Sequence, residues 1–287
     1  MSGRSFKIGV VASAGQMDPL IVSPVCDLAG KLYGRDVELR FHPACFGKHG
    51  HFSSDDATRA QAFLDYAQND DIDSIWFGRG GYGSARIAAT VLAGLGAHGL
   101  QKSYLGYSDV GVLLAGLYKF GGRRIAHGPM VQDLRRDNGE EAVERALRWL
   151  VEQSAETIEE GVCRASLSIA FNLTVLCHLI GTVWEPDLTD HVVLIEEVSE
   201  PLYRIDRGLC QLAHTKTFQK SAGLRLGRCS NIIPNEPDFV LSPEEIAQHW
   251  CSVAGIPYLG RADIGHDAQN KIVPFGRVNL DHFAANL

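Results

Sequence analysis

A serine, a glutamate and a histidine in distant parts of the sequence have the types that serine-dependent hydrolysis requires. The serine is Ser108, which follows the apolar segment 103–107 and stands two residues after Gly106. That arrangement is typical of a sharp turn from a strand into a helix, which exposes the hydroxyl and lets the backbone N–H of Asp109 point at a nearby oxyanion. A serine at such a junction is also a common helix N-cap, and the second glycine of the G-x-S-x-G pattern is absent, so the motif alone leaves both interpretations open.

Glu196 and His266 are the candidates for the acid and the base that a serine nucleophile needs. Glu196 leaves the apolar segment 192–195, where a carboxylate is rare unless it is paired or functional. His266 follows Gly265 in a loop that leads to the last strands. Taken singly, a glutamate at a strand end often reaches water, and each of the 11 histidines is more often structural or solvated than catalytic.

A glycine-rich loop at residues 78–83 follows another expected strand. Its glycines match G-x-G-x-x-G by spacing, but the acidic residue that a dinucleotide site needs about 20 positions later is missing. We interpret the loop instead as a source of backbone N–H groups, because glycine adopts positive φ and has no Cβ to block a substrate. Gly80 and Tyr82 are then predicted substrate contacts, and Gly81 joins Asp109 in forming an oxyanion hole.

The elements that must position these residues follow from the hydrophobic periodicity. The first 150 residues alternate short β-branched or aromatic runs with amphipathic stretches, which is typical of βαβ units around a parallel sheet. We expect strands at 6–12, 36–41, 73–78, 103–108 and 123–127, and helices at 56–69, 84–95, 109–120 and 139–153. The predicted fold class is α/β, with a flavodoxin-like N-terminal domain. Loops after neighbouring parallel strands leave at the same edge, which brings Gly81 toward Ser108.

The pattern changes after Gln153, where a polar connector leads into shorter strands. We expect strands at 191–198 and 271–280 and helices at 202–213 and 242–253. A second, smaller and β-rich domain is therefore predicted, and the two domains are expected to span residues 1–155 and 160–287. No flexible linker separates them, so they are expected to pack together.

Composition excludes several classes of protein. The chain has 287 residues, 45% of them hydrophobic, and a net charge of −7 with no basic stripe that would follow nucleic-acid phosphates. Seven cysteines without a C-x-x-C pair suit a reducing compartment. No stretch reaches the roughly 20 apolar residues of a membrane span, and the N-terminus lacks the pattern of a signal peptide. We expect a cytoplasmic protein with no nucleic-acid or membrane partner.

Two further histidine motifs have weaker implications. Cys45, His49 and His51 have a spacing that could suit a metal, but no fourth ligand stands nearby and a lysine lies among them. We therefore predict no metal site and no cofactor. His127 ends the fifth expected strand at the same edge as the serine, so its side chain is a candidate for the substrate pocket as well as for a plain turn.

Taken together and in this order, the segments resemble the serine LD-carboxypeptidase family over nearly the whole chain. The matching segments of the first half are 47–53, 55–59, 79–83 with Arg86, 106–109 and 127–130. Those of the second half are 172–173, 181–182, 195–198 with Glu200, 203–207, 265–266 and 274–276. Each motif is short, but jointly they are highly specific.

The resemblance implies a cytoplasmic enzyme of cell-wall recycling that hydrolyses the L,D-peptide bond before the terminal D-alanine of muropeptide tetrapeptides. It also implies that Ser108 is the nucleophile, Glu196 the acid and His266 the base, with the amides of Gly81 and Asp109 in the oxyanion hole. The expected partner is a small muropeptide substrate, and the expected assembly is a homodimer with the active site where the domains meet.

Two features of the substrate site are not determined by the resemblance. Where the family usually has two glycines before Asn172, this chain has Ala170 and Phe171, whose bulk is expected to alter a nearby pocket wall. A free C-terminal residue also needs a cation for its carboxylate, and Arg86 and Arg207 are both candidates.

Two alternative functions are also consistent with the sequence. Some members of the same family cleave other amides, including peptide–antibiotic conjugates, in self-immunity. A non-catalytic nucleotide-binding α/β protein would instead use the glycine-rich loop at 78–83 to hold a phosphate.

Overall fold

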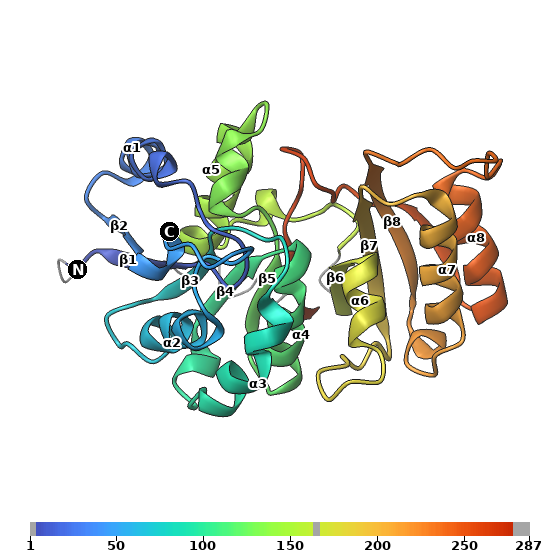
Figure 1. Cartoon of the computed structure of the whole chain (residues 1–287), viewed down its shortest axis with the longest axis horizontal. Coiled ribbons are helices and arrows are strands. Elements are labelled where there is room, and N and C mark those ends of the chain that lie inside the picture. Colours follow the sequence, from blue (N-terminus) through green and yellow to red (C-terminus); the bar gives the residue numbers. More distant parts are fainter. Residues whose placement is uncertain (1–3, 163–166, 278–287) are drawn as a thin grey trace.

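Two sheets lie side by side along the long axis of the molecule in a computed structural model that describes residues 4–162 and 167–277 (Figure 1). In the first sheet, five parallel strands have the order β2-β1-β3-β4-β5, and β10 is added antiparallel to β5. These strands are β1 (Phe6–Val11), β2 (Val37–Phe41), β3 (Ser74–Phe77), β4 (Ser103–Gly106), β5 (Arg124–His127) and β10 (Val273–Pro274). The order of the parallel strands is that of flavodoxin-like folds.

Side chains of the first sheet alternate between two apolar layers. On β3, Ile75 and Phe77 enter one buried cluster, whereas Trp76 enters another. One layer is covered by α2 (Asp56–Ala67), α3 (Ser84–Gly94) and α4 (Gly111–Lys119), and the other by α1 (Val22–Tyr33) and α5 (Gly139–Glu152). A parallel sheet needs cover on both faces, which its crossover helices supply. The predicted α/β fold class is confirmed.

The second sheet has the order β11-β6-β7-β8-β9, and β6 to β9 are parallel. Its strands are β6 (Leu167–Asn172), β7 (His191–Val198), β8 (Gly223–Ser230), β9 (Tyr258–Arg261) and β11 (Gly276–Arg277). Three helices connect the parallel strands and pack on one face: α6 (Leu173–Leu179), α7 (Leu202–Ala213) and α8 (Pro243–Ala254). The smaller second domain therefore contains a parallel sheet of its own.

The other face of the second sheet is covered by the C-terminal segment of the chain. Ala170 and Leu194 pack there against Ile264 and Val273. The segment then enters the first sheet as β10 and returns to the second as β11. The single strand expected at 271–280 is thus wrong in part. The backbone leaves β10 after Pro274 and begins β11, in the other sheet, at Gly276, whose φ is +83°. Residues 278–280 lie outside the described residues.

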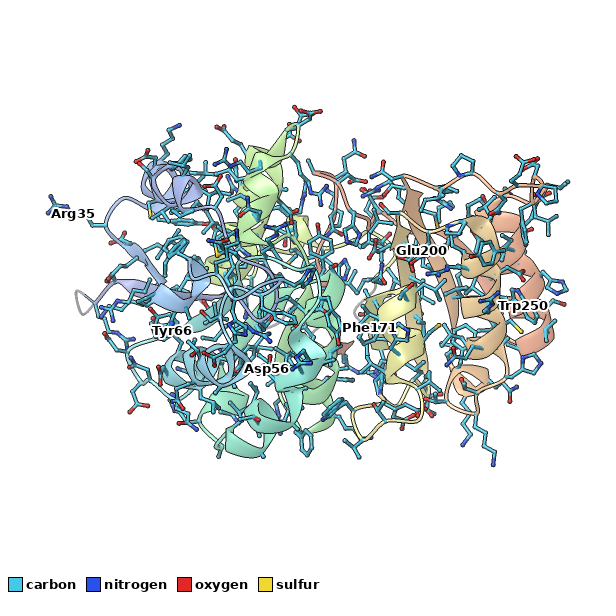
Figure 2. All side chains as sticks on the ribbon, viewed as in Figure 1. Arg35, Asp56, Tyr66, Phe171, Glu200 and Trp250 are labelled. Atoms are coloured by element: carbon cyan, nitrogen blue, oxygen red, sulfur yellow. The ribbon has the colours of Figure 1, made fainter. Side chains whose placement is uncertain are left out.

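Phe171 lies in the contact between the two sheets (Figure 2). Its side chain is buried, its ring centroid is 5.3 Å from that of Phe275, and a Cβ on Gly111 would come within 3.2 Å of its ring. Gly111 begins α4 of the first domain, so Phe171 packs one domain against the other. The structure places this bulk in the interdomain core, which corrects the expectation that it alters a pocket wall.

Two expectations from composition can be compared with the structure. The six cysteines in the described ranges carry free thiols, while Cys163 lies outside those ranges. None of the helices that the structure describes combines the length and the apolar character needed to cross a bilayer.

Replacing Phe171 with alanine should lower the free energy of unfolding by about 3–5 kcal/mol, because it leaves a cavity between the domains. Urea unfolding measures this difference. Phe120→Ala is the matched control, since Phe120 is 54% exposed, and it should change the stability by less than about 0.5 kcal/mol. Equal losses in the two variants would contradict the packing role of Phe171.

Candidate active site

Ser108 lies at the carboxyl edge of the first sheet, where β4 leads into a short 3-10 helix (η4, Ser108–Val110) and then into α4. Its backbone has φ of +61°, a left-handed conformation that costs roughly 1–3 kcal/mol for a residue other than glycine. Gly106 permits the turn, because a Cβ there would lie 3.0 Å from Phe77 and from Val110. The turn leaves Ser108 partly exposed, as a nucleophile requires.

The glycine-rich loop at 78–83 lies against this serine. A Cβ on Gly80 would come within 3.2 Å of Ser108 Oγ, so a side chain there would crowd the hydroxyl. Gly81 has φ of +114°, a conformation that glycine adopts readily. Within the described ranges, the backbone N–H groups of Gly81 and Asp109 donate to no other residue. Both amides are therefore free to bind a ligand.

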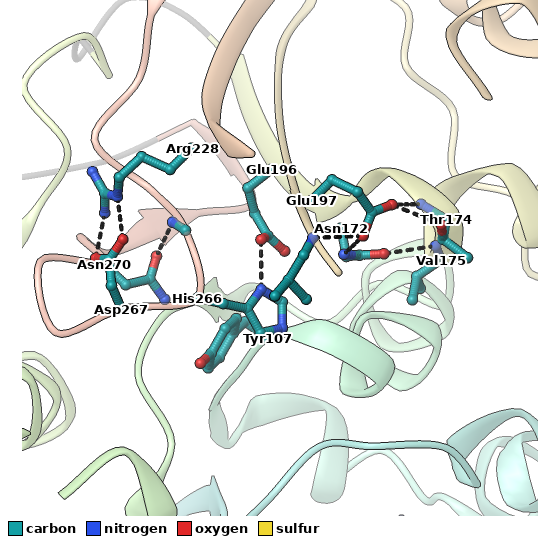
Figure 3. Close-up of polar contacts among 12 residues, drawn as sticks. Tyr107, Asn172, Thr174, Val175, Glu196, Glu197, Arg228, His266, Asp267 and Asn270 are labelled. Atoms are coloured by element: carbon teal, nitrogen blue, oxygen red, sulfur yellow. Dashed lines mark hydrogen bonds and ion pairs between the residues drawn. The ribbon is translucent and has the colours of Figure 1, made fainter. Parts of the chain in front are cut away.

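Glu196 and His266 form a buried hydrogen-bonded pair (Figure 3). His266 Nδ1 lies 2.6 Å from Glu196 Oε2, and the Glu196 side chain is fully buried. Gly227 on the neighbouring strand β8 makes room for it, since a Cβ there would lie 3.0 Å from the Cβ of Glu196. The other carboxylate oxygen, Oε1, has no hydrogen-bond partner among the described residues. A buried carboxylate with a free oxygen is unusual, and such groups are concentrated at functional sites.

The adjacent Glu197 has a different role. Successive side chains on a strand point to opposite faces, so Glu196 faces the C-terminal segment while Glu197 faces the helices (Figure 3). Glu197 accepts hydrogen bonds from Asn172 Nδ2 at 2.6 Å and from the backbone N–H of Thr174 at 2.9 Å. These contacts anchor the N-terminus of α6. The structure thus distinguishes two neighbouring glutamates that the local sequence does not.

The surroundings of His266 raise its proton affinity. Burial lowers the pKa of His266, but the Glu196 carboxylate raises it more, through its charge and its hydrogen bond, so the pKa lies above the ordinary value of 6.5. With Nδ1–H donated to the carboxylate, Nε2 of the neutral imidazole carries the lone pair. The pair therefore has the form of a general base with an orienting acid.

Tyr107 connects this pair to the turn at Ser108. It immediately precedes Ser108, and its ring centroid lies 4.9 Å from that of His266. Its hydroxyl donates to Asp133 Oδ1 at 2.9 Å, and Arg136 binds the same oxygen at 2.6 Å. In the described structure Ser108 Oγ makes no hydrogen bond to His266; such catalytic bonds are often long until substrate is bound.

Asn270 and Arg228 fix the loop that carries His266. Asn270 Oδ1 accepts a hydrogen bond from the backbone N–H of Gly265 at 3.2 Å. Arg228 pairs with Asp267, the residue after the histidine, at 2.8 Å. Sequence reasoning missed both supporting residues, because no local motif marks a side chain whose partner lies far along the chain.

His127 is buried next to the loop that carries His266. Its side chain is 1% exposed, and its Nε2 is 3.1 Å from Asn270 Oδ1. Burial lowers the pKa of His127 to about 4, so the imidazole is neutral near pH 7. A buried, neutral histidine bonded to the support of the His266 loop fits a structural role better than the predicted contact with substrate.

Of the other predicted substrate residues, Gly80 is buried, whereas Tyr82, Arg86 and Arg207 are exposed. Tyr82 is 52% exposed in the glycine-rich loop. Arg86 forms an ion pair with Asp56 at 2.7 Å, whereas Arg207 stands on α7 with its guanidinium 5.3 Å from the centroid of the Tyr203 ring. An arginine already paired with a carboxylate attracts a second one less strongly, so the structure disfavours Arg86 as the ligand of a substrate carboxylate.

The structure assembles no metal site from Cys45, His49 and His51. Across residues 4–162 and 167–277, no group of three or more histidine, cysteine, aspartate or glutamate side chains is arranged to hold a metal ion. Cys45 is buried with its Sγ 3.3 Å from the carbonyl oxygen of Val10, and burial raises the pKa of its thiol to about 12.

Family models match both halves of the chain. Residues 8–128 match the model of the LD-carboxypeptidase N-terminal domain, and residues 168–279 match that of the LD-carboxypeptidase C-terminal domain. The chain belongs to the LD-carboxypeptidase family. The resemblance inferred from the sequence motifs is thereby confirmed.

Relatives and solved structures agree with this assignment. A Synechocystis sp. protein with the name of a carboxypeptidase is 32% identical over 87% of this chain and 83% of its own length. The murein tetrapeptide carboxypeptidase of Pseudomonas aeruginosa is 26% identical over 72% of this chain and 71% of its own. The crystal structure of muramoyltetrapeptide carboxypeptidase from Oxalobacter formigenes has a TM-score of 0.76 at 23% identity, covering 94% and 92% of the two chains. The microcin C7 self-immunity protein MccF has a TM-score of 0.77 at 19% identity, covering 96% and 92%; at these identities both structures show a shared fold.

The Glu196–His266 pair predicts the pH dependence of this LD-carboxypeptidase. A base must be neutral to accept a proton, so kcat/KM should fall as the pH drops through the raised pKa of His266, which lies above 6.5. Glu196→Gln removes the charge that raises this pKa, so the pKa of His266 should fall. Histidine NMR titration measures the shift, with the exposed Glu156→Gln as control. An unchanged His266 pKa in Glu196→Gln would contradict the coupling.

Proposed function

We propose that this LD-carboxypeptidase is a serine peptidase that removes the terminal D-alanine from muropeptide tetrapeptides by hydrolysing the L,D-peptide bond. The observation that carries the proposal is the buried Glu196–His266 pair, which rests against the tyrosine that leads into the strained Ser108 turn. Support for the substrate comes from the sequence similarity to the murein tetrapeptide carboxypeptidase of P. aeruginosa. The muramoyltetrapeptide carboxypeptidase of O. formigenes shares the fold.

In the first half-reaction, His266 Nε2 takes the Ser108 hydroxyl proton as Oγ attacks the carbonyl carbon of the scissile bond. Glu196 holds Nδ1–H and offsets the positive charge that the imidazole gains. The amides of Gly81 and Asp109 donate to the oxyanion of the tetrahedral intermediate. The imidazolium then protonates the nitrogen of D-alanine, the C–N bond breaks, and an acyl ester remains on Ser108.

Water completes the cycle. His266 takes a proton from a water molecule as its oxygen attacks the ester carbonyl, and the same two amides bind the second oxyanion. Collapse of this intermediate releases the tripeptide carboxylate and returns the proton to Ser108 Oγ. Each proton transfer in this scheme involves His266, so the scheme calls for no cofactor.

In this proposal the catalytic residues are divided between the two domains. Residues 1–155 would carry the nucleophile and the oxyanion amides, and residues 160–287 would carry the acid and the base. The active site then lies where the two sheets meet. A homodimer and a cytoplasmic location, both implied by the family resemblance, stay predictions.

A same-family hydrolase of peptide–antibiotic conjugates is the second candidate. The fold shared with the microcin C7 self-immunity protein supports it. That likeness, at 19% identity, is one of fold alone, whereas the P. aeruginosa enzyme is also similar in sequence, so we favour the muropeptide. A nucleotide-binding role for the loop at 78–83 is less consistent with the structure, because Gly80 lies against the Ser108 hydroxyl.

Replacing Ser108 with alanine should lower kcat for D-alanine release by roughly 10⁴- to 10⁶-fold while the affinity for the tetrapeptide is retained, because only the attacking oxygen is lost. Enzymatic detection of D-alanine and calorimetry measure the two quantities. Ser252→Ala, at an exposed position of α8, is the matched control and should behave as wild type. Undiminished D-alanine release by Ser108→Ala would contradict the peptidase, and a wild type that cleaves only a conjugate would favour the second candidate.

A further inference from the structure

Helix α3 follows the loop that carries Gly81, but it cannot cap its own first turn. Its N-cap residue is Gly83, which has no side chain to accept a hydrogen bond. The acceptor comes from elsewhere in the chain: Asp109 Oδ2 accepts from the backbone N–H of Ser84 at 2.8 Å. Asp109 is buried, and its carboxylate lies at the partially positive end of the helix dipole. A residue next to the nucleophile therefore fixes the end of the glycine-rich loop.

Arg59 of α2 binds the same loop end. Its side chain is buried, and Nη1 donates to the carbonyl oxygen of Gly83 at 3.1 Å and to that of Ser13. Its Nε donates to the carbonyl oxygen of Ser54 at 3.1 Å, so three loops of the first domain meet at one guanidinium. Gly83 has φ of +147°, and a Cβ there would lie 2.8 Å from Arg59 Nη1. Arg59 thus binds the carbonyl group of Gly83, and Asp109 binds the N–H of the next residue, Ser84.

The charge of Asp109 argues against a direct role in stabilising the oxyanion. In the proposed reaction a negative oxygen develops beside the backbone N–H of this same residue, and a nearby carboxylate disfavours a second negative charge. If charge alone mattered, a neutral residue at position 109 would accelerate the reaction. Burial raises the pKa of Asp109 above its ordinary value, and hydrogen bonds from Ser84 and Gly83 offset part of that rise. The contacts that hold the loop are therefore also those that favour the anionic form.

We propose that Asp109 and Arg59 are positioning residues that hold the two oxyanion donors at a fixed separation. Asp109 supplies one donor through its own N–H, and its side chain fixes the loop just beyond Gly81, which supplies the other. The inference rests on the function proposed above, because it assumes that both amides bind the oxyanion. A donor displaced by a fraction of an ångström weakens binding of the transition state while leaving ground-state binding of the peptide intact.

The variants Asp109→Asn and Ser242→Ala form a matched test. Asparagine keeps the size of aspartate but replaces one acceptor oxygen with a donor, so the loop end loses an acceptor. In Asp109→Asn, kcat for D-alanine release should fall roughly 10- to 100-fold with KM changed less than about threefold, and Arg59→Lys should act in the same way. Ser242 caps α8 in the second domain, and its replacement should leave kcat and KM unchanged.

The affinity for a tripeptide boronic acid distinguishes a positioning role from a simple loss of stability. Its boron bonds to Ser108 Oγ, the hydroxyl proton passes to His266, and the boron becomes a tetrahedral anion that resembles the intermediate. Calorimetry should show that Asp109→Asn binds the boronic acid more weakly by the same factor as its loss in kcat. Affinity for the tripeptide product should stay unchanged, because that ligand carries no tetrahedral anion.

An unchanged or increased kcat in Asp109→Asn would overturn the proposal, and so would a loss of kcat without a parallel loss of boronic acid affinity. If Asp109→Asn does not fold, Arg59→Lys carries the same comparison. A wild type that binds the boronic acid but releases no D-alanine would refute the muropeptide substrate alone, and the boronic acid comparison would still decide the role of Asp109. A wild type that does not bind the boronic acid would refute both proposals.

Discussion

The buried contact between Glu196 and His266 is the interaction on which the rest of the site depends. Taking a carboxylate out of water costs several kcal/mol, and a buried ion pair seldom repays that cost in full. Here the cost is larger still, because one oxygen of Glu196 lacks a hydrogen-bond partner among the described residues. The pair is therefore poorly explained as a source of stability. It is well explained by chemistry, since an imidazole that must act as a base needs an orienting anion on its other nitrogen.

That contact also explains the path of the C-terminal segment. The helices of the second domain cover one face of its sheet, and Glu196 points to the other face, so His266 must come from whatever covers that other face. The C-terminal segment does so and then pairs with β5 as β10. Because β5 is the neighbour of β4, which leads to Ser108, one stretch of chain carries His266 from the second sheet toward Ser108 of the first.

The sequence predicts the parts of this arrangement that depend on local signals. The parallel strands of the first sheet and its helices α2 to α5 follow their hydrophobic periodicity, although α1 (Val22–Tyr33) was not predicted. Helix α7 (Leu202–Ala213) coincides with its predicted range. By contrast, β8 was not predicted: it contains two glycines, which disfavour strands, and one of them, Gly227, is needed to make room for Glu196. The three proposed catalytic residues were recognised by type and by family motif. Their supports were not, because Asn270 and Tyr107 act through partners that only the fold brings close.

The strained turn at Ser108 is held by its two neighbours in sequence. Relaxing a left-handed serine would gain roughly 1–3 kcal/mol. Tyr107 and Asp109 are both buried, and each is hydrogen-bonded to a different element, Asp133 on one side and the start of α3 on the other. A shift of the turn would leave both polar groups unpaired, at about 1–3 kcal/mol each, so the strained conformation is the cheaper one. These two hydrogen bonds account for a left-handed turn at Ser108 without the second glycine of G-x-S-x-G, where this chain has Val110.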